Sequence, residues 1–336
     1  MRTCWVLDHP AHVRLLAPFL RAGQSDDVII ATQRKEVENL LQQGDGHLPR
    51  RQTHWVERPV GKNRRKKALL RWSSSHRFLR QCNQSREPIR RIVSIGAPLE
   101  LMAWKSPFLR RRLKSIEQRW YITDTEVNHT AHSLACKAAT DVVLPTHWRE
   151  ELDNGFAQSL KSVSLHRLDG LHGHVHLRPS RRPAKVSNPP RILVRRLKGG
   201  GIHDEDELID FPDEVLDGLL ITSADENEFM GDAWSLDREI AAHDGVITQS
   251  VTLASEAVLL GTPTLLVSKA ERGFLDRLQS DGHPLFRWKK ECEGVEWKNL
   301  QAQFLTGIHL TEALEPEEWP NSRRQLANLL GSELID

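Results

Sequence analysis

No apolar run in this 336-residue chain is long enough to cross a lipid bilayer, which takes about 20 residues. The first residues lack the apolar core of a secretory signal peptide, and no segment repeats at a solenoid period. Cysteine is scarce and forms no C-x-x-C pair, which argues against a structural metal site or a disulfide framework. We therefore expect a cytoplasmic protein whose thiols are buried or incidental, at Cys4, Cys82, Cys136 and Cys292.

Charge is unevenly distributed along the chain. The hydrophobic fraction of 39% suffices for packed cores, and the length suits two domains of ordinary size. Residues 1–180 contain 30 Lys and Arg against 17 Asp and Glu, whereas residues 181–336 contain 17 against 28. The net charge of +2 therefore conceals a basic half and an acidic half, which favours two domains with different duties.

The most informative stretch is HDGVITQSVTLASEAVLLGTPTLLV, residues 243–267. It begins with a short apolar run, GVIT, which predicts a buried parallel strand, and continues into a polar turn, QSVT. Apolar residues then recur at helical spacing until Gly261 and Pro263 end the helix, and a second apolar strand, TLLV, follows. This order with short connections is typical of a doubly wound parallel sheet.

The first half of the chain shows the same alternation. Apolar strand patterns each end in a polar loop, and helical patterns separate them. A proline-rich segment without apolar periodicity predicts a linker at residues 179–190. We therefore expect an α/β protein in which residues 1–178 form a basic domain and residues 191–336 form an acidic one.

Polar residues follow the predicted strands of the first domain, which is where parallel sheets bind ligands. His12 lies near the start of a helix, where a histidine of near-neutral pKa can act as a general base. Asp124, Glu126 and His129 share a loop after a later strand and could supply a base or bind sugar hydroxyls. The alternative for each residue is a purely structural hydrogen bond. Their spacing matches no established metal motif, so we expect no metal site.

The second domain offers a candidate anion site. The turn before its central helix presents backbone N–H groups together with the hydroxyls of Ser250 and Thr252, which suit a phosphate. Arg195 and Lys198 follow the first strand of this domain and could neutralise a diphosphate leaving group. Lys198 precedes three glycines, an order that does not match a Walker A motif, and an ordinary flexible turn is the alternative. Glu256 is either a solvated helix residue or a carboxylate that binds ligand.

Three histidines alternate in H-G-H-V-H, residues 172–176. In an extended segment all three would lie on one side, which makes a metal site conceivable. No acidic or thiol ligand is near in sequence, so we favour a loop at the domain junction.

A basic run covers residues 58–91, which contain 12 Lys and Arg and a single acid, Glu87. We consider a solvated helix face, a membrane-binding surface and a nucleic-acid surface. No nucleic-acid motif accompanies the charge, so peripheral contact with the anionic inner face of a membrane ranks above nucleic acid. Trp72 is the expected apolar anchor, and the basic residues that would make the contact are Lys62, Arg64, Arg65, Lys66 and Lys67.

The chain resembles a mostly archaeal family of unknown function that has a GT-B-like fold. That family is related to UDP-N-acetylglucosamine 2-epimerases and GT-B glycosyltransferases. D-H-P-A-H-V at residues 8–13 is similar to the family's N-P-P-H-V, and D-T-E at 124–126 is similar to D-N-E. S-E-A with L-G-T-P at 255–263 resembles R-E-A-x-x-L-G-x-P. Gln249 and Ser250 stand where such proteins have glycines, so close backbone approach to a diphosphate is less assured.

The resemblance implies two Rossmann-like domains facing a central cleft, with the last helix a candidate to cross back to the first domain. It also implies that Glu256 binds the ribose of a nucleotide. Our leading hypothesis is a metal-independent GT-B glycosyltransferase that uses a nucleotide-sugar, preferably a UDP-sugar, as substrate and holds no bound cofactor. Its base would be His12, Asp124 or Glu126, and its acceptor could be lipid-linked. The alternatives are a non-hydrolysing sugar-nucleotide 2-epimerase and a non-catalytic protein that binds a polyanion.

Overall fold

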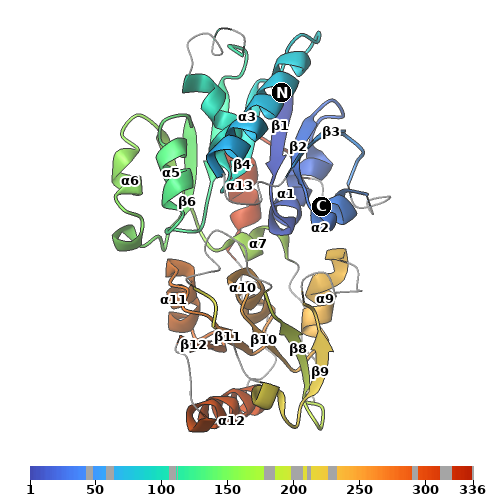
Figure 1. Ribbon diagram of the computed structural model, residues 1–336, viewed down its shortest axis with the longest axis vertical. Coiled ribbons are helices and arrows are strands. Elements are labelled where there is room, and N and C mark those ends of the chain that lie inside the picture. The colour runs from blue at the N-terminus through green and yellow to red at the C-terminus, as the bar shows by residue number, and fades with distance from the viewer. Residues whose placement is uncertain are drawn as a thin grey trace. The chain divides into compact units, whose positions relative to one another are not determined.

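A computed structural model describes residues 1–42, 48–57, 64–105, 111, 113–177, 186–197, 207–209, 213–225, 233–289, 294–310 and 320–334. The chain divides into two compact units (Figure 1). Unit 1 comprises Met1–His176 and Asn321–Asp336, and unit 2 comprises Leu177–Pro320. The final segment therefore belongs to unit 1, although unit 2 precedes it in the sequence.

In its described residues, unit 1 is a parallel sheet of seven strands with helices in the connections. Its strands are β1 (Thr3–Leu7), β2 (Val28–Gln33), β3 (Gln52–Glu57), β4 (Arg91–Ile95), β5 (Gln118–Ile122), β6 (Asp141–Pro145) and β7 (Ser164–Leu168). Its α-helices are α1 (Pro10–Ala22), α2 (Lys35–Gln42), α3 (Arg64–Cys82), α5 (His129–Ala135), α6 (Phe156–Ser159), α7 (His172–His176) and α13 (Ser322–Leu330). The 3-10 helices are η1 (Pro98–Lys105) and η2 (Glu150–Leu152).

The strand order of unit 1 is β3-β2-β1-β4-β5-β6-β7. Trp5 in β1 pairs with Ile29 of β2 on one side and with Val93 of β4 on the other. The chain thus reverses its direction across the sheet between β1 and β4. In doubly wound sheets the crevice beyond the strand C-termini at such a reversal is where ligands bind.

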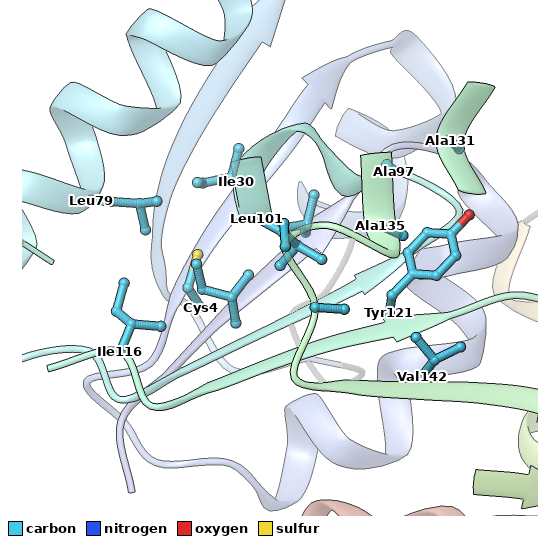
Figure 2. Close-up of a cluster of buried hydrophobic side chains, with 14 of the residues drawn as sticks. Cys4, Ile30, Leu79, Ala97, Leu101, Ile116, Tyr121, Ala131, Ala135 and Val142 are labelled. Atoms are coloured by element: carbon cyan, nitrogen blue, oxygen red, sulfur yellow. The ribbon is translucent and has the colours of Figure 1, made fainter. Parts of the chain in front are cut away.

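Buried aliphatic residues explain why these strands form the interior of unit 1. All five residues of β1 are buried, as expected for a parallel strand covered by helices on both faces. One face of the sheet and the helices above it form a cluster that includes Cys4, Ile30, Leu79 and Tyr121 (Figure 2). Burial of each side chain of this size contributes about 1.5–3 kcal/mol, so the sheet is a rigid base for the loops at its edge.

The described part of unit 2 contains a parallel sheet of five strands in the order β12-β11-β10-β8-β9. These strands are β8 (Arg191–Arg195), β9 (Leu220–Ser223), β10 (Gly245–Thr248), β11 (Thr264–Val267) and β12 (Leu285–Trp288). The α-helices are α9 (Leu236–Ala241), α10 (Val251–Leu259), α11 (Gly273–Ser280) and α12 (Gly294–Leu310), and the 3-10 helices are η3 (Asp213–Leu216) and η4 (Ala233–Ser235). Here the reversal lies between β8 and β10, which pair directly.

Helix α12 packs closely on the sheet of unit 2. Its Phe304 and Ile308 are fully buried in one cluster with Ile192 and Ile247. A Cβ atom on Gly245 would lie 2.7 Å from the ring of Phe304, so only glycine permits this close approach at the start of β10. The sequence analysis identified β10 but not the helix that covers it.

The structure corrects the expectation for residues 172–176. H-G-H-V-H forms the short helix α7, not an extended segment. Successive residues of a helix are rotated by about 100°, so alternate histidines do not share a side. Among the described residues, no group of three or more His, Cys, Asp or Glu side chains is placed to hold a metal ion.

None of the helices in the described part of the chain combines the length and apolar character needed to cross a membrane.

Candidate functional site

In unit 1 the candidate residues lie in loops at the C-terminal edge of the sheet. Asp8 directly follows β1, and His9 caps α1 by accepting a hydrogen bond from Ala11 N at 3.3 Å. Proline at the first helical position fits this helix start, because its missing N–H would have no partner there. His12 therefore lies in the first turn of α1, beside the reversal of the sheet.

Asp8 is held by a buried arginine from another element. Arg71 Nη2 of α3 lies 2.7 Å from Asp8 Oδ1, and Arg71 Nε donates to Glu100 Oε1 at 3.0 Å. Thr32 at the end of β2 donates to Asp8 and accepts from Arg71 Nη1 at 3.2 Å. Burial alone would raise the pKa of Asp8, but Arg71 and the hydrogen bonds lower it below its usual value. The loop after β1 therefore carries a fixed negative charge.

His12 is a neutral hydrogen-bond donor in this setting. Burial lowers the pKa of His12 to about 4, and the nearby His172 and Arg34 add to the effect that Asp8 and Asp124 oppose. The backbone N–H of Asp8 donates to His12 Nδ1 at 3.4 Å. A neutral ring that accepts at Nδ1 carries its hydrogen on Nε2. His12 can thus donate through Nε2 but is a poor candidate for the base.

The structure pairs Asp124 with a residue that sequence reasoning treated separately. Asp124 follows β5, and its Oδ2 atom accepts a hydrogen bond from His172 Nδ1 of α7 at 2.9 Å. Thr125 Oγ1 donates to Asp124 Oδ1 at 3.1 Å. Burial would raise the pKa of Asp124, but His172 and these hydrogen bonds hold it well below its usual range. Asp124 is therefore ionised and orients the ring of His172, whose side chain is 18% exposed.

This arrangement leaves His172 Nε2 as the ring nitrogen that is not bonded to the carboxylate. An imidazole whose Nδ1–H is held by a carboxylate can accept a proton at Nε2, and the carboxylate stabilises the resulting cation. His12 and His172 are close enough to influence each other electrostatically. The site thus combines a neutral donor at His12 with a candidate base at His172.

Helix α13 fixes the segment that carries His172. Gln325 accepts from Asp169 N and donates to Arg167 O, each at 2.8 Å. Arg323 Nε donates to Val175 O in α7 at 2.7 Å. The last helix of unit 1 therefore holds both ends of the β7–α7 connection.

The other two members of the predicted acidic loop occupy different surroundings. Glu126 is fully buried, and its Oε1 atom accepts from Arg149 N at 3.2 Å. His129 is exposed at the first position of α5. Such burial favours a structural role for Glu126, and its catalytic role stays a prediction.

In unit 2 the predicted anion site lies at the reversal between β8 and β10. Ser250 caps α10, and its Oγ atom accepts from Leu253 N at 3.3 Å. Thr252 is exposed in the first turn of the same helix. Arg195 ends β8, and within the described residues its Nε atom is buried without a hydrogen-bond partner. A helix N-terminus beside an arginine is suited to bind an anion. Lys198 lies outside the described residues.

Glu256 is buried in α10, with only 2% of its surface exposed. The interpretation of Glu256 as a solvated helix residue is therefore wrong. A buried carboxylate requires compensating contacts, so the surrounding protein, and not solvent, fixes the position of the Glu256 side chain.

Gln249, the first residue after β10, connects three segments. Its Oε1 atom accepts from Leu197 N at 2.8 Å, and its Nε2 atom donates to Ile209 O at 2.7 Å. Gln249 N donates to Arg195 O at 3.2 Å. The side chain thus turns into the protein and fixes the loop after β8.

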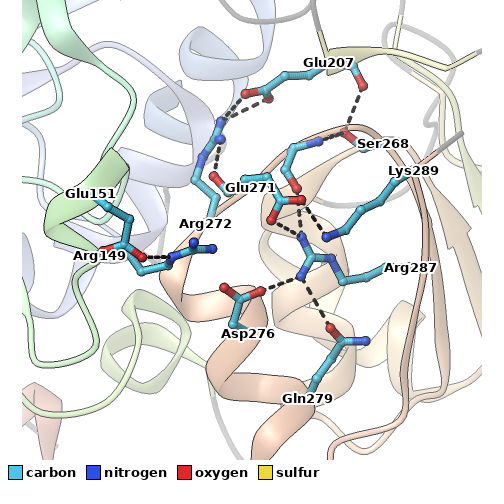
Figure 3. A network of polar contacts seen from close by, with 11 residues as sticks. Arg149, Glu151, Glu207, Ser268, Glu271, Arg272, Asp276, Gln279, Arg287 and Lys289 are labelled. Atoms are coloured by element: carbon cyan, nitrogen blue, oxygen red, sulfur yellow. Dashed lines mark hydrogen bonds and ion pairs between the residues drawn. The ribbon is translucent and has the colours of Figure 1, made fainter. Parts of the chain in front are cut away.

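A second set of contacts holds residues 207–209 from the end of β11. Both carboxylate oxygens of Glu207 accept from Arg272 Nη2, at 2.8 and 3.0 Å (Figure 3). Ser268 Oγ donates to Glu207 O at 3.1 Å. With the bond from Gln249 to Ile209, residues 207–209 are fixed from the ends of both β10 and β11.

No family model and no curated protein sequence matches the chain. Among solved structures, UDP-GlcNAc 2-epimerase from Methanocaldococcus jannaschii matches with a TM-score of 0.60 and 12% identity, over 99% of this chain and 100% of that one. The fold is of the GT-B type.

Other GT-B structures match over similar lengths. UDP-GlcNAc 2-epimerase from Neisseria meningitidis, bound to UDP-GlcNAc, has a TM-score of 0.59 and 10% identity, covering 98% of this chain and 99% of that one. MurG from Acinetobacter baumannii has a TM-score of 0.52 and 11% identity, with coverages of 98% and 99%. The chain therefore has two Rossmann-like domains, and at these identities the likeness defines the fold alone.

Proposed function

We propose that this protein is a GT-B glycosyltransferase that moves a sugar from a nucleotide-sugar donor to an acceptor hydroxyl. The observation that carries the proposal is the Asp124–His172 pair at 2.9 Å. Transfer to a hydroxyl requires a base, and an imidazole oriented by a carboxylate is a common choice for that task.

In the proposed reaction His172 Nε2 removes the proton of the acceptor hydroxyl. The acceptor oxygen forms a bond to the anomeric carbon, and the bond from that carbon to the donor phosphate breaks. The nucleoside diphosphate leaves with the electron pair, and Asp124 stabilises the protonated His172. Neutral His12 donates a hydrogen bond to a substrate oxygen through Nε2, much as neutral histidines do in other enzymes.

Unit 2 is the proposed donor-binding domain. Arg195 and the first turn of α10 would bind the diphosphate, Glu256 would accept hydrogen bonds from ribose hydroxyls, and Lys198 would add charge. A uridine nucleotide is the first candidate, because several proteins of similar fold were crystallised with UDP or a UDP-sugar. The proposed site uses side chains and backbone N–H groups and assigns no role to a metal.

Arg195 offers a direct test of the donor site. Titration calorimetry with UDP and UDP-GlcNAc should detect binding that Arg195→Gln weakens by about tenfold or more, since a charge-assisted contact contributes roughly 1.5–3 kcal/mol. The matched control is Arg196→Gln, which removes the neighbouring guanidinium that pairs with Asp213. Equal weakening in both variants, or no binding to wild type, would contradict the proposed site.

The products distinguish the competing functions. The protein is incubated with the nucleotide-sugar that binds, with and without a lipid extract as the source of acceptor. Sugar found on a lipid supports transfer, whereas an isomerised donor in the absence of acceptor would identify an epimerase. Binding to nucleic acid without any binding of nucleotide-sugars would favour the non-catalytic alternative.

A further inference from the structure

Helix α3 presents two different faces. Its buried face consists of Arg71, Ser75, Phe78, Leu79 and Cys82. The opposite side has exposed residues at spacings of three and four, namely Lys66, Leu69, Leu70, Ser73, Arg77 and Arg80. This spacing places them on one side of the helix, which we call the outer stripe.

The outer stripe contains the two most exposed large hydrophobic side chains in the described part of the chain. Leu69 is 62% exposed and Leu70 is 60% exposed, and they are adjacent. Isolated exposed leucines are common, but a leucine pair on a helix bordered by charge is typical of surfaces that enter a lipid interface. Trp72, the anchor that the sequence suggested, is half-buried, and its ring centroid lies 5.7 Å from that of His76 in a stacked pair, so the two leucines are better exposed for insertion.

The charges of the outer stripe have one sign. Lys66 precedes the leucines, and Arg77 and Arg80 follow them by two and three turns. The only acid in residues 58–91 is Glu87, which lies beyond the helix. Basic side chains on both sides of an apolar pair are complementary to lipid headgroups above an acyl layer.

We propose that α3 docks this protein on an anionic lipid surface, with Leu69 and Leu70 inserted and Lys66, Arg77 and Arg80 on the headgroups. The docking surface itself does not depend on the proposed transfer. If the transfer is correct, the surface implies an acceptor that resides in the membrane. Nucleic acid fits less well, because the outer stripe offers leucines where single-strand binding would use exposed aromatic rings.

The test is flotation of the full-length protein with lipid vesicles. Wild type should bind vesicles of phosphatidylcholine mixed with phosphatidylglycerol and bind pure phosphatidylcholine weakly. Arg77→Gln with Arg80→Gln should weaken binding by about fivefold for each cation removed. Leu69→Ser with Leu70→Ser should weaken it by about tenfold or more, because two apolar side chains no longer enter the interface.

Two control pairs make the result specific. Arg238→Gln with Arg324→Gln removes the same charge at exposed positions on other helices, and Leu165→Ser with Leu220→Ser removes exposed leucines elsewhere. Both control proteins should bind like wild type, and melting temperatures should stay unchanged in every variant. Equal losses in the control and stripe variants would overturn the proposal. A wild-type protein that does not bind anionic vesicles would also overturn the proposal, whether or not it binds single-stranded RNA through the same arginines.

The docking proposal and the transferase proposal can be contradicted independently of each other. Vesicle binding needs no nucleotide, so a protein that binds vesicles but no nucleotide-sugar would retain the docking surface and lose the transferase function. A protein that transfers sugar to a water-soluble acceptor without binding vesicles would do the reverse.

Discussion

At the scale of single residues, the Asp124–His172 pair is the part of the structure most open to test. Asp124→Asn keeps the shape of the side chain but removes the charge that orients and stabilises the imidazole. We expect kcat for sugar transfer to fall by about 10²–10⁴ with little change in nucleotide affinity, since the base is weakened while the donor contacts remain.

A second aspartate–histidine pair in the same unit supplies the control for that experiment. Asp141 Oδ1 lies 3.0 Å from His166 Nε2. Asp141 is the first residue of β6, so this pair does not lie at the C-terminal edge of the sheet, where Asp124 is found. Asp141→Asn should leave kcat close to the wild-type value. A similar loss in both variants would mean that Asp124 acts only through stability.

The lowered pKa of His12 predicts that the stability of the protein depends on pH. Its pKa is about 4 in the folded protein against an ordinary value of 6.5, so between these values the unfolded chain binds a proton that the folded chain does not. Stability should therefore fall as the pH drops from 6.5 toward 4, by on the order of 3 kcal/mol in total. Below pH 4 His12 is protonated in both the folded and the unfolded state, and its contribution to the free energy of unfolding no longer changes with pH.

Urea unfolding across that pH range measures the effect. The free energy of unfolding of His12→Gln should depend less on pH than that of wild type between pH 6.5 and 4. His129→Gln, at an exposed position, should show the same pH dependence as wild type. If His12→Gln keeps the full wild-type slope, the histidine is not buried as a neutral ring.

Sequence reasoning placed single polar residues at the C-terminal edge of the sheet better than it paired them. The sequence placed Asp8–His12 and Asp124 at this edge because polar residues after apolar strands gather at one edge of a parallel sheet. The same rule applied to the strand that ends at Leu168 would have brought His172 to that edge. The sequence did not single out Arg71 from the other basic residues of its helix, because charge alone does not reveal which arginine points inward.

At the scale of elements, α3 depends on one buried ion network. Arg71→Met leaves Asp8 and Glu100 without their cation, and removal of one partner of a buried ion pair costs about 3–5 kcal/mol. Urea unfolding of Arg71→Met should show that loss. Arg77→Met, on the exposed face of the same helix, should change stability by less than about 0.5 kcal/mol. Comparable losses would show that the network contributes little.

The elements that sequence patterns predicted best are the central strands. The runs GVIT and TLLV, residues 245–248 and 264–267, form strands with the predicted bounds, because continuous burial requires continuous apolar residues. The strands β3 and β12 were missed because they lie at sheet edges, where half-buried residues leave no clear period.

At the scale of the whole molecule, unit 1 is discontinuous in sequence. Leu326, Ala327 and Leu330 of α13 are buried, and Arg91 Nη1 donates to Leu330 O. Deletion of residues 321–336 should therefore destabilise unit 1, although the deleted segment follows unit 2. Hydrogen exchange read by mass spectrometry should show faster exchange in β7 and α7 and unchanged exchange in β10 and β11. Uniform loss of protection in both units would contradict this assignment.

The fold could be predicted from the sequence at this scale, because alternating strands and helices leave few arrangements of a parallel sheet. The chemistry was harder to predict. Asp124 and His172 are separated by 47 intervening residues, and no local pattern records which strand ends become neighbours.

One feature of α3 joins its two faces. Leu70 and Arg71 are consecutive, so one points outward while the other holds Asp8 and, through the Asp8 N–H, the ring of His12. Neighbouring residues on a helix differ by about 100° about its axis, and the helix turns as a rigid rod. One helix therefore contributes both an exposed leucine to the surface of unit 1 and a buried guanidinium to the support of the loop that carries His12.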